Sequence, residues 1–395
     1  MLLSLPPHVC ACMDALERAG FEAWAVGGCV RDLLLGDLPH DYDVATSALP
    51  AEVLQLFPRA APTGISYGTV SVVTQGGVIE VTTFRTETGY QGFRRPERIC
   101  FASQLQEDLS RRDFTVNAMA YTPKRGLYDL FGGQEDLRRG VVRAVGEPGQ
   151  RFEEDALRIL RAFRFASQLD FSIEQATLDA ALAWAGNLAC ISAERVAAEL
   201  MKALEGRRPS RLLPLLQNGA LSFCGLSGPA TFPSEPFDAL PLSLPLRLAA
   251  LCFFCEAQAG AVCGALKLSN ALRRSTEAYE RQLCEPAPQT KYGLKACFST
   301  LPPENWENLL VARSLLFGEQ AQPLRALCED IQKRQEPWRL SQLAVDGNDL
   351  KAIGIPPGRE LGELLHRLLR AVMEHPEWNT RRTLLEIAQG AKGRR

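Results

Sequence analysis

The strongest constraint on the fold is a change in hydrophobic periodicity near residue 140. Before it, short alternating apolar runs are punctuated by glycines, a pattern typical of strands mixed with short helices. From about residue 150 onward, apolar residues recur three and four positions apart, as in EEDALRILRAFRFASQL and SAERVAAELMKALEG. The chain is therefore predicted to be α+β, with a mixed sheet in an N-terminal part that is followed by helices alone.

Single elements can be assigned within the N-terminal part. We expect strands at 22–28 and 41–44, helices at 30–36 and 50–57, and a hairpin over 68–85 that turns at Gly76 and Gly77. Residues 86–109 then break the pattern with two glycines, a proline and a group of arginines that includes Arg94 and Arg95. This composition predicts a mobile loop.

Composition excludes several classes of protein. The 395 residues suggest two or three domains, and 46% hydrophobic with 23% charged residues is typical of a globular chain rather than a disordered one. No window of about 18 apolar residues occurs, so no transmembrane helix is expected. The net charge of −2 by itself disfavours a polyanion partner. Residues 138–168, however, hold seven arginines against four acidic residues, so the net charge of the whole chain does not decide which partner the protein binds.

Twelve cysteines are present, and residues 1–20 lack a signal-peptide pattern, so we expect free thiols and a cytoplasmic protein. Cys252 and Cys255 form a CxxC in an apolar run without a second CxxC or a histidine pair. That context favours a buried helical pair over a metal site.

Two carboxylates, Asp41 and Asp43, stand two positions apart in a predicted strand. Alternate residues of a strand share a face, so these like charges lie close together and require a cation. Their oxygen ligands suit Mg²⁺, which leaves positions open for substrate phosphate. The same pattern also occurs in ordinary solvated turns, and its surroundings must decide between the two.

Five motifs supply those surroundings. GGCVRDLLLG followed by DYDVATSALP resembles the head motif of class II tRNA nucleotidyltransferases and bacterial poly(A) polymerases. The resemblance recurs, in the family's order, in LSRRDFTVNAMAY, YDLFGGQEDL, RAVGEP and RFEEDALRILRAFRFA. It implies that Asp41 and Asp43 are catalytic and hold Mg²⁺, with Glu80 as the third acidic residue. Glu80 could instead face solvent without binding metal.

The resemblance also implies a nucleotide site. Gly28 lies between a predicted strand and helix, where backbone amides can approach phosphate, and Arg31 adds a cation. Arg112 is implied to bind the triphosphate, and Asp113 and Asn117 the ribose. Alternatively, Arg112 and Asp113 pair with each other at a domain junction.

Base selection is implied to lie on a two-sided helix in EEDALRILRAFRFA. Asp155 accepts hydrogen bonds and Arg158 donates them, a combination that matches cytosine and adenine and mismatches guanine and uracil. Arg161 and Arg164 complete the implied nucleotide-binding set. The alternative is a surface helix with an ordinary Glu154–Arg158 ion pair.

The motifs also bear on which family member the chain resembles. FPRAAPTGISYGTVSVV lacks the basic GRRF-type segment of bacterial poly(A) polymerases and resembles CCA-adding enzymes. We therefore expect CCA addition to tRNA from CTP and ATP, with no membrane or protein partner implied. An A-only enzyme, a poly(A) polymerase and a tRNA-binding protein that retains the fold stay open, as does the oligomeric state.

The expected organisation is a five-stranded head (1–137), a neck that recognises the base (138–206), a body (207–335) and a tail that binds tRNA (336–395).

Overall fold

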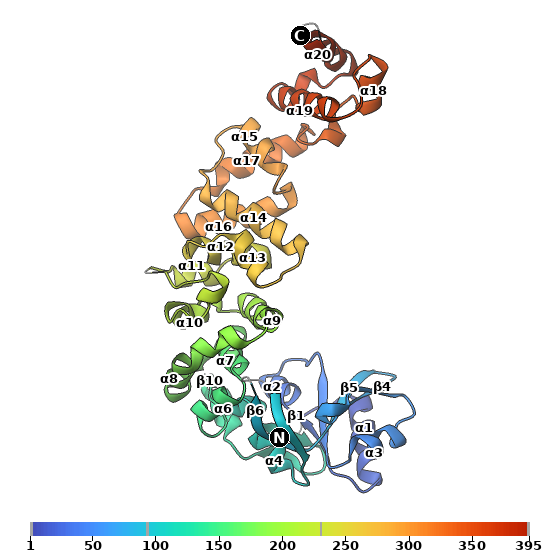
Figure 1. The fold of residues 1–395 in the computed structure, drawn as a ribbon, viewed down its shortest axis with the longest axis vertical. Coiled ribbons are helices and arrows are strands. Elements are labelled where there is room, and N and C mark those ends of the chain that lie inside the picture. Colours follow the sequence, from blue (N-terminus) through green and yellow to red (C-terminus); the bar gives the residue numbers. More distant parts are fainter. Residues whose placement is uncertain (1–2, 92–94, 230, 393–395) are drawn as a thin grey trace. The chain divides into compact units, whose positions relative to one another are not determined.

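The computed structural model describes residues 3–91, 95–229 and 231–392. The chain forms two compact units, the first made of Met1–Ala230 with Ala265–Lys267 and the second of Thr231–Gly264 with Leu268–Arg395. Figure 1 gives the labels of their helices and strands. The first unit holds every residue predicted for catalysis and nucleotide binding, and the second is helical.

A seven-stranded mixed sheet forms the base of the first unit, in the order β3-β4-β5-β2-β1-β8-β9. Its strands are β1 Ala23–Val26, β2 Tyr42–Thr46, β3 Ala60–Gly64, β4 Thr69–Thr74, β5 Gly77–Thr83, β8 Met119–Thr122 and β9 Gly126–Asp129. Of the neighbouring strands in this order, β2 and β5 pair in parallel, and the other neighbours pair antiparallel. The β4–β5 hairpin and its turn at Gly76 and Gly77 are confirmed, whereas the expected count of five strands is wrong.

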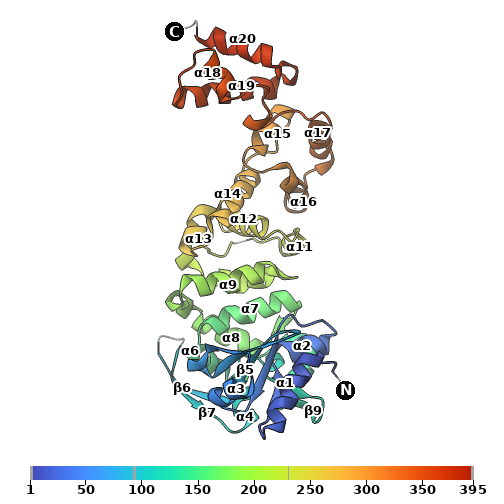
Figure 2. The ribbon, with the colours of Figure 1, turned by 90° about the vertical axis from the view of Figure 1, so that its right-hand side faces the viewer.

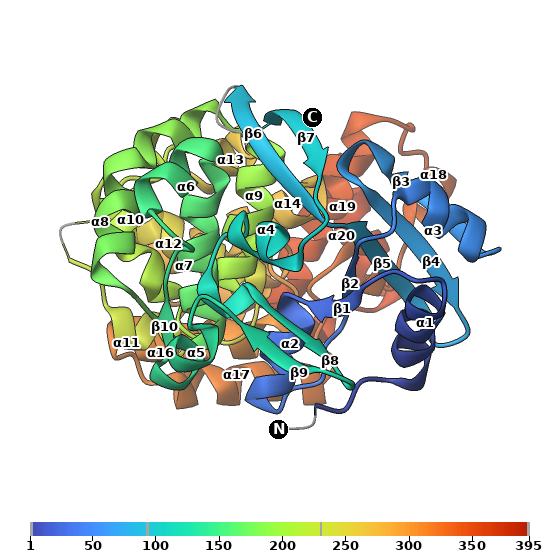
Figure 3. The ribbon, with the colours of Figure 1, turned by 90° about the horizontal axis from the view of Figure 1, so that it is seen from below.

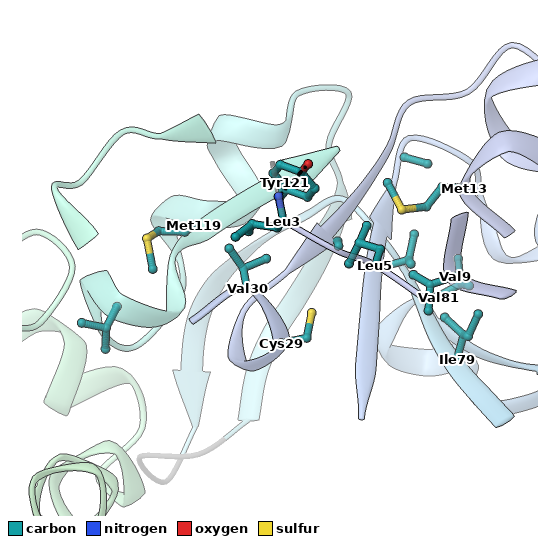
Figure 4. Packing of buried hydrophobic residues seen from close by; sticks show 14 of the residues in the cluster. Leu3, Leu5, Val9, Met13, Cys29, Val30, Ile79, Val81, Met119 and Tyr121 are labelled. Carbon is teal, nitrogen blue, oxygen red and sulfur yellow. Dashed lines mark hydrogen bonds between the residues drawn. The ribbon is translucent and has the colours of Figure 1, made fainter. Parts of the chain in front are cut away.

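One face of the sheet is covered by helices α1 (Pro7–Arg18), α2 (Gly28–Leu35) and α3 (Pro50–Leu56). Figure 4 shows Val9 and Met13 of α1 among the buried side chains that include Ile79 and Val81 of β5. These residues alternate with polar ones along β5, because successive side chains of a strand point to opposite faces. The largest apolar core of the head therefore lies on this face.

The other face of the sheet is covered over only part of its width. Helix α4 (Leu105–Ser110) contributes Leu105 and Leu109 to a second apolar cluster. The cluster also contains Trp24, Val26, Ala45, Phe84 and Ala120, which come from or adjoin the middle strands. It includes no buried residue of β3 or β4, so those strands are not covered by it.

The loop expected at 86–109 is not a loop. Strands β6 (Arg85–Gln91) and β7 (Arg95–Phe101) form an antiparallel hairpin, and α4 follows. The sequence did not predict this hairpin because its strands are rich in glycine, proline and arginine and carry little apolar alternation. Arg94 lies outside the described residues, and Arg95 begins β7.

Helices complete the first unit, with one short parallel pair, β10 (Val141–Val142) and β11 (Ser172–Ile173). They are α5 Gly133–Arg139, α6 Pro148–Glu154, α7 Leu157–Leu169, α8 Gln175–Trp184, α9 Ala193–Leu204 and α10 Leu213–Gln217. Figure 2 shows α7 and α9 running side by side, and Leu160 and Phe163 of α7 are fully buried.

The single helix expected over EEDALRILRAFRFA is interrupted. Asp155 has an extended backbone (φ −141°, ψ 103°) between α6 and α7. Its carboxylate accepts a hydrogen bond from the backbone N–H of Leu157 at 3.0 Å. An aspartate offers the backbone this alternative to a continuous helix, and apolar spacing alone does not reveal it.

The second unit is all-α, as expected. Its helices are α11 Ser234–Asp238, α12 Leu244–Phe254, α13 Ala259–Ala265, α14 Asn270–Cys284, α15 Lys291–Phe298, α16 Trp306–Phe317, α17 Ala321–Lys333, α18 Gly347–Ala352, α19 Arg359–Glu374 and α20 Arg381–Lys392. Cys252 is buried in α12, as expected, whereas Cys255 is only half-buried and caps the C-terminal end of that helix, so the expected buried helical pair is confirmed for Cys252 alone. Within the described ranges, no single helix is long and apolar enough to cross a membrane, although α12 and α13 together pass that test as a bent pair.

Candidate active site

Three carboxylates meet at the centre of the head sheet. Asp43 on β2 is the direct register partner of Glu80 on the parallel strand β5, so the two side chains share a face. Asp41 precedes β2 by one residue and is exposed, as is Glu80, whereas Asp43 is half-buried. The structure therefore brings together the acidic residues predicted from sequence.

The three carboxylates of this trio repel one another. Burial raises the pKa of Asp43, and the charges of Glu80 and Asp41 raise it further, while Arg112 opposes them. A divalent cation between the carboxylates would relieve this repulsion, and oxygen ligands of this kind suit Mg²⁺. The described side chains are not arranged as a ready set of three or more metal ligands. The donor chemistry fits the ion, and substrate oxygens would have to complete its coordination.

A glycine turn lies beside the carboxylates. Gly27 caps helix α2 with φ +75°, a conformation that favours glycine, and Gly28 begins the helix. A Cβ atom at Gly27 would lie 2.9 Å from Nη1 of Arg112, so the guanidinium packs against the turn. The Nε atom of Arg112 is buried without a hydrogen-bond partner among the described residues. Backbone amides at a helix N-terminus and a cation together suit a phosphate group.

A hydrogen-bonded chain connects α2 with α7. Arg31 donates to Asn117 at 2.6 Å, and Asn117 donates to Asp113 at 3.2 Å. Asp113 also accepts two hydrogen bonds from Arg161, at 2.8 and 2.6 Å. Arg112 pairs instead with Asp108 at 3.1 Å, so the alternative of an Arg112–Asp113 pair is wrong.

The Asp113 carboxylate is held ionised within this chain. Burial opposes its ionisation, but the charge and hydrogen bonds of Arg161 outweigh that effect and lower the pKa of Asp113 to about 2. Any contact with a ribose has to compete with these protein partners.

Three guanidinium groups surround the ring of Phe165. Those of Arg31, Arg161 and Arg164 lie 5.2, 5.4 and 4.1 Å from the ring centre. Burial, together with the charge of Arg161, lowers the pKa of Arg164 to about 10, and Glu199 provides a counter-charge at 3.0 Å. Guanidinium groups from both α2 and α7 thus contact the same aromatic ring.

The two residues predicted to read the base have different partners. Asp155 accepts a hydrogen bond from Arg195 at 3.3 Å. Arg158 donates to Glu154 at 2.6 Å and to the carbonyl of Arg111 at 3.0 Å. The expectation that both lie on one helix three residues apart is wrong because of the break at Asp155. The ion pair named as the alternative, Glu154–Arg158, is present.

Sequence reasoning missed three residues that support the site, namely Asp108, Arg195 and Glu199. Asp108 is fully buried, and both Arg111 and Arg112 pair with it. Its position three and four residues before two arginines in EDLSRRD is the helical spacing of an ion pair and could have identified it. Arg195 and Glu199 come from α9, and nothing local predicts their tertiary partners.

Comparison with known proteins identifies the class to which this fold and site belong. Residues 23–143 match the poly A polymerase head domain, and residues 170–221 match a model described as a probable RNA and SrmB-binding site of polymerase A. These matches define a nucleotidyltransferase head followed by an associated helical region.

Closer relatives specify the family. The chain is 39% identical to the CCA-adding enzyme of Lactiplantibacillus plantarum, with 95% of this chain and 94% of that protein covered. It is 38% identical to the CCA-adding enzyme of Enterococcus faecalis, with 96% and 95% covered. The chain therefore belongs to the CCA-adding enzyme family.

A solved structure agrees with this assignment. The CCA-adding enzyme of Bacillus stearothermophilus in complex with CTP matches with a TM-score of 0.81 at 32% identity, covering 98% of this chain and 100% of that one. The Thermotoga maritima CCA-adding enzyme complexed with tRNA has a TM-score of 0.61 at 21% identity, which supports the fold alone.

Proposed function

We propose that the protein adds CCA to the 3′ end of tRNA without a template, using CTP and ATP. The observation that carries this proposal is the register of Asp43 with Glu80 on parallel strands, beside the glycine turn at Gly27 and Gly28. The reaction is attack by the RNA 3′-hydroxyl on the α-phosphate of the nucleotide, with release of pyrophosphate.

Asp41 and Asp43 are the proposed ligands of Mg²⁺, and Glu80 is the third acidic residue of the site. When bound, the ion lowers the pKa of the attacking hydroxyl and offsets charge on the phosphates. Half-buried Asp43 is fixed by its strand, whereas exposed Asp41 stands just before β2.

The triphosphate is proposed to lie at the N-terminus of α2. Gly28 offers backbone N–H groups there, Arg112 offers a guanidinium with one unpaired N–H, and Arg31 lies one turn further along the helix. Asn117 and Asp113 are the proposed ribose contacts. Their existing bonds to Arg31 and Arg161 hold both side chains in place before a nucleotide arrives.

Asp155 and Arg158 are the proposed readers of the base, supported by Arg161 and Arg164. Asp155 is held from one side by Arg195, and Arg158 by Glu154. Reading a base requires that these side chains exchange protein partners for the base edge. A base of the wrong pattern would leave buried polar groups unpaired, which is the costly failure that gives selectivity.

Several further assignments follow from the same proposal. The partners are tRNA, CTP and ATP, and the proposed location of the protein is the cytoplasm. The head (1–137), neck (138–206), body (207–335) and tail (336–395) are the proposed divisions, with the tail contacting tRNA.

The proposal is tested with three tRNA transcripts that lack CCA, end in C, or end in CC, each offered one nucleotide at a time with Mg²⁺. Extension of all three, with CTP or ATP as appropriate, is the expected result. Extension of the CC-ended transcript alone would identify an A-adding enzyme, and a long run of A residues a poly(A) polymerase. Binding without release of pyrophosphate would identify a tRNA-binding protein.

A further inference from the structure

The aromatic ring of Phe165 lies where two helices of the first unit come into contact. Phe165 belongs to α7 and is 5% exposed, and its ring contacts the guanidinium group of Arg31, which comes from α2. Figure 3 shows both helices, α2 in blue and α7 in green. The ring therefore joins two segments that are distant in the sequence.

Two arginines connect this ring to the proposed ribose contacts. Arg31, 5.2 Å from the ring centre, donates a hydrogen bond to the side-chain oxygen of Asn117 at 2.6 Å. Arg161, 5.4 Å from the same centre, donates two hydrogen bonds to Oδ2 of Asp113. The Asn117 amide in turn donates to Oδ1 of Asp113 at 3.2 Å, so the two connections join at their far ends. The positions of both ribose contacts therefore depend on where two guanidinium groups stand against one ring.

A third contact of the ring leads to the same carboxylate. The ring of Phe114 stands edge-on to that of Phe165, with 5.7 Å between the ring centres. Phe114 is fully buried, and its backbone N–H donates to the side chain of the preceding residue, Asp113, at 2.9 Å. Removal of the Phe165 ring would thus loosen both the backbone that carries Asp113 and the arginine that holds its carboxylate.

The contacts of this ring require an aromatic side chain rather than any apolar one. The face of a phenyl ring carries partial negative charge and attracts cations, most strongly where water is excluded. A third guanidinium group, that of Arg164, lies 4.1 Å from the centre of the Phe165 ring. Like charges repel one another, so three guanidinium groups gather here more readily around a negative ring face. A leucine at position 165 would occupy most of the same space without that face.

We propose that Phe165 is a positioning residue that sets the preference for ribonucleotides over deoxyribonucleotides. This proposal rests on the proposed function, in which Asp113 and Asn117 contact the ribose. A 2′-hydroxyl both donates and accepts hydrogen bonds, the Asp113 carboxylate accepts them, and the Asn117 amide does both. The pair recognises the hydroxyl only if both side chains are held at hydrogen-bonding distance from it. Phe165 does not touch the nucleotide and acts through Arg31 and Arg161.

The first test compares leucine substitutions at two buried phenylalanines of α7. Phe165→Leu removes the ring between the arginines, whereas Phe163→Leu removes a fully buried ring that no arginine of the described residues overlies. On CC-ended tRNA, Phe165→Leu should lower the ratio of kcat/KM for ATP to kcat/KM for dATP by about fivefold or more, because the hydrogen bonds to the 2′-hydroxyl are weakened. Phe163→Leu should keep the wild-type ratio. An equal fall with ATP and dATP in Phe165→Leu would overturn the proposal.

A second test changes the charge distribution of the ring and nearly preserves its size. Phenylalanine derivatives with one, two or three fluorine atoms on the ring are incorporated at position 165. Fluorine withdraws electron density, so each derivative weakens the attraction between the ring face and a cation further than the last. We expect the ATP-to-dATP ratio to fall stepwise across this series, and the same series at position 163 to leave the ratio unchanged. A constant ratio across the series at position 165 would contradict the proposal.

The wild type separates the failure of this proposal from the failure of the proposed function. If the wild type adds no ATP to CC-ended tRNA, the proposed function itself fails. If it adds ATP and dATP equally well, or if the variants at position 165 keep its preference for ATP, only the role of Phe165 fails.

Discussion

Arg161 donates hydrogen bonds from both Nε and Nη2 to the same oxygen of Asp113, at 2.8 and 2.6 Å. The pair joins α7 to the segment that precedes β8 and is buried on the Asp113 side. It therefore fixes the neck helix to the head through an interaction that depends on an ionised carboxylate.

This pair makes a testable contribution to acid stability. The pKa of Asp113 falls from 3.8 to about 2 on folding, so its contribution is complete above pH 4 and is lost as the pH drops toward 2. The shift corresponds to about 2 kcal/mol. In urea unfolding across this range, the wild type should lose more free energy of unfolding than Asp113→Asn. The exposed control Asp37→Asn should follow the wild type. Parallel curves for wild type and Asp113→Asn would contradict the assignment.

The carboxylate site predicts a separation of catalysis from binding. Asp41→Ala should reduce nucleotide incorporation by more than about a hundredfold, because a ligand for the proposed cation is removed. Binding of tRNA, measured by filter retention, should stay within about twofold. Asp37→Ala, an exposed aspartate four residues earlier, is the control and should retain activity. Retained incorporation in Asp41→Ala would refute the mechanism.

The glycine turn allows a matched comparison of strain with steric conflict. Gly27 and Gly36 have φ of +75° and +83°, but only at Gly27 would a Cβ meet a neighbour, Arg112. Alanine should cost about 1–3 kcal/mol of stability at either position, because a residue with a Cβ atom rarely adopts such a positive φ. Only Gly27→Ala should also raise the KM for CTP and ATP, because it displaces the guanidinium. A normal KM for CTP and ATP in Gly27→Ala would show that Arg112 does not bind the triphosphate.

Base choice is expected to depend on Arg158. Arg158→Ala should incorporate GTP and UTP at rates closer to those of CTP and ATP, because the donor opposite the base edge is lost. Single-turnover rates with each nucleotide measure this ratio. Arg151→Ala is the comparison, since it also removes an arginine that pairs with Glu154. Unchanged selectivity in Arg158→Ala would show that other residues read the base.

In the second unit, a buried ion pair predicts a large effect on stability. Lys295 is 1% exposed and pairs with Glu336 at 2.7 Å. Glu336→Gln leaves this ammonium buried without full compensation, which should cost about 3 kcal/mol. The exposed pair of Arg359 with Glu363 is the control, and Glu363→Gln should change stability by less than about 0.5 kcal/mol. Similar urea midpoints for the two variants would contradict this prediction.

Sequence reasoning recovered the features that depend on local chemistry. The acidic pair at Asp41 and Asp43, the glycine turn and the β4–β5 hairpin follow from residue spacing, and the structure shows them where they were predicted. Glu80 was predicted beside Asp43, and the parallel register confirms that position, although its role as a metal ligand stays a prediction.

The features that were missed depend on contacts between distant segments. The partners of Asp155 and Arg161 are Arg195 and Asp113, which lie 40 and 48 residues away in the chain. Periodicity predicts which face of a helix is apolar, but it does not predict which charges meet across two helices. The hairpin at β6 and β7 was missed for another reason, since polar strands carry little hydrophobic alternation.

On one face of the head sheet, substitutions beside α4 and substitutions around Val78 have different effects. Around Ala45 the side chains are enclosed by α4, so a substitution there changes how firmly the head folds. Around Val78 they are open to solvent, and a substitution changes which surface the head presents. The stability of the head and the chemistry of its exposed surface can therefore be altered separately in this protein, within a single layer of backbone.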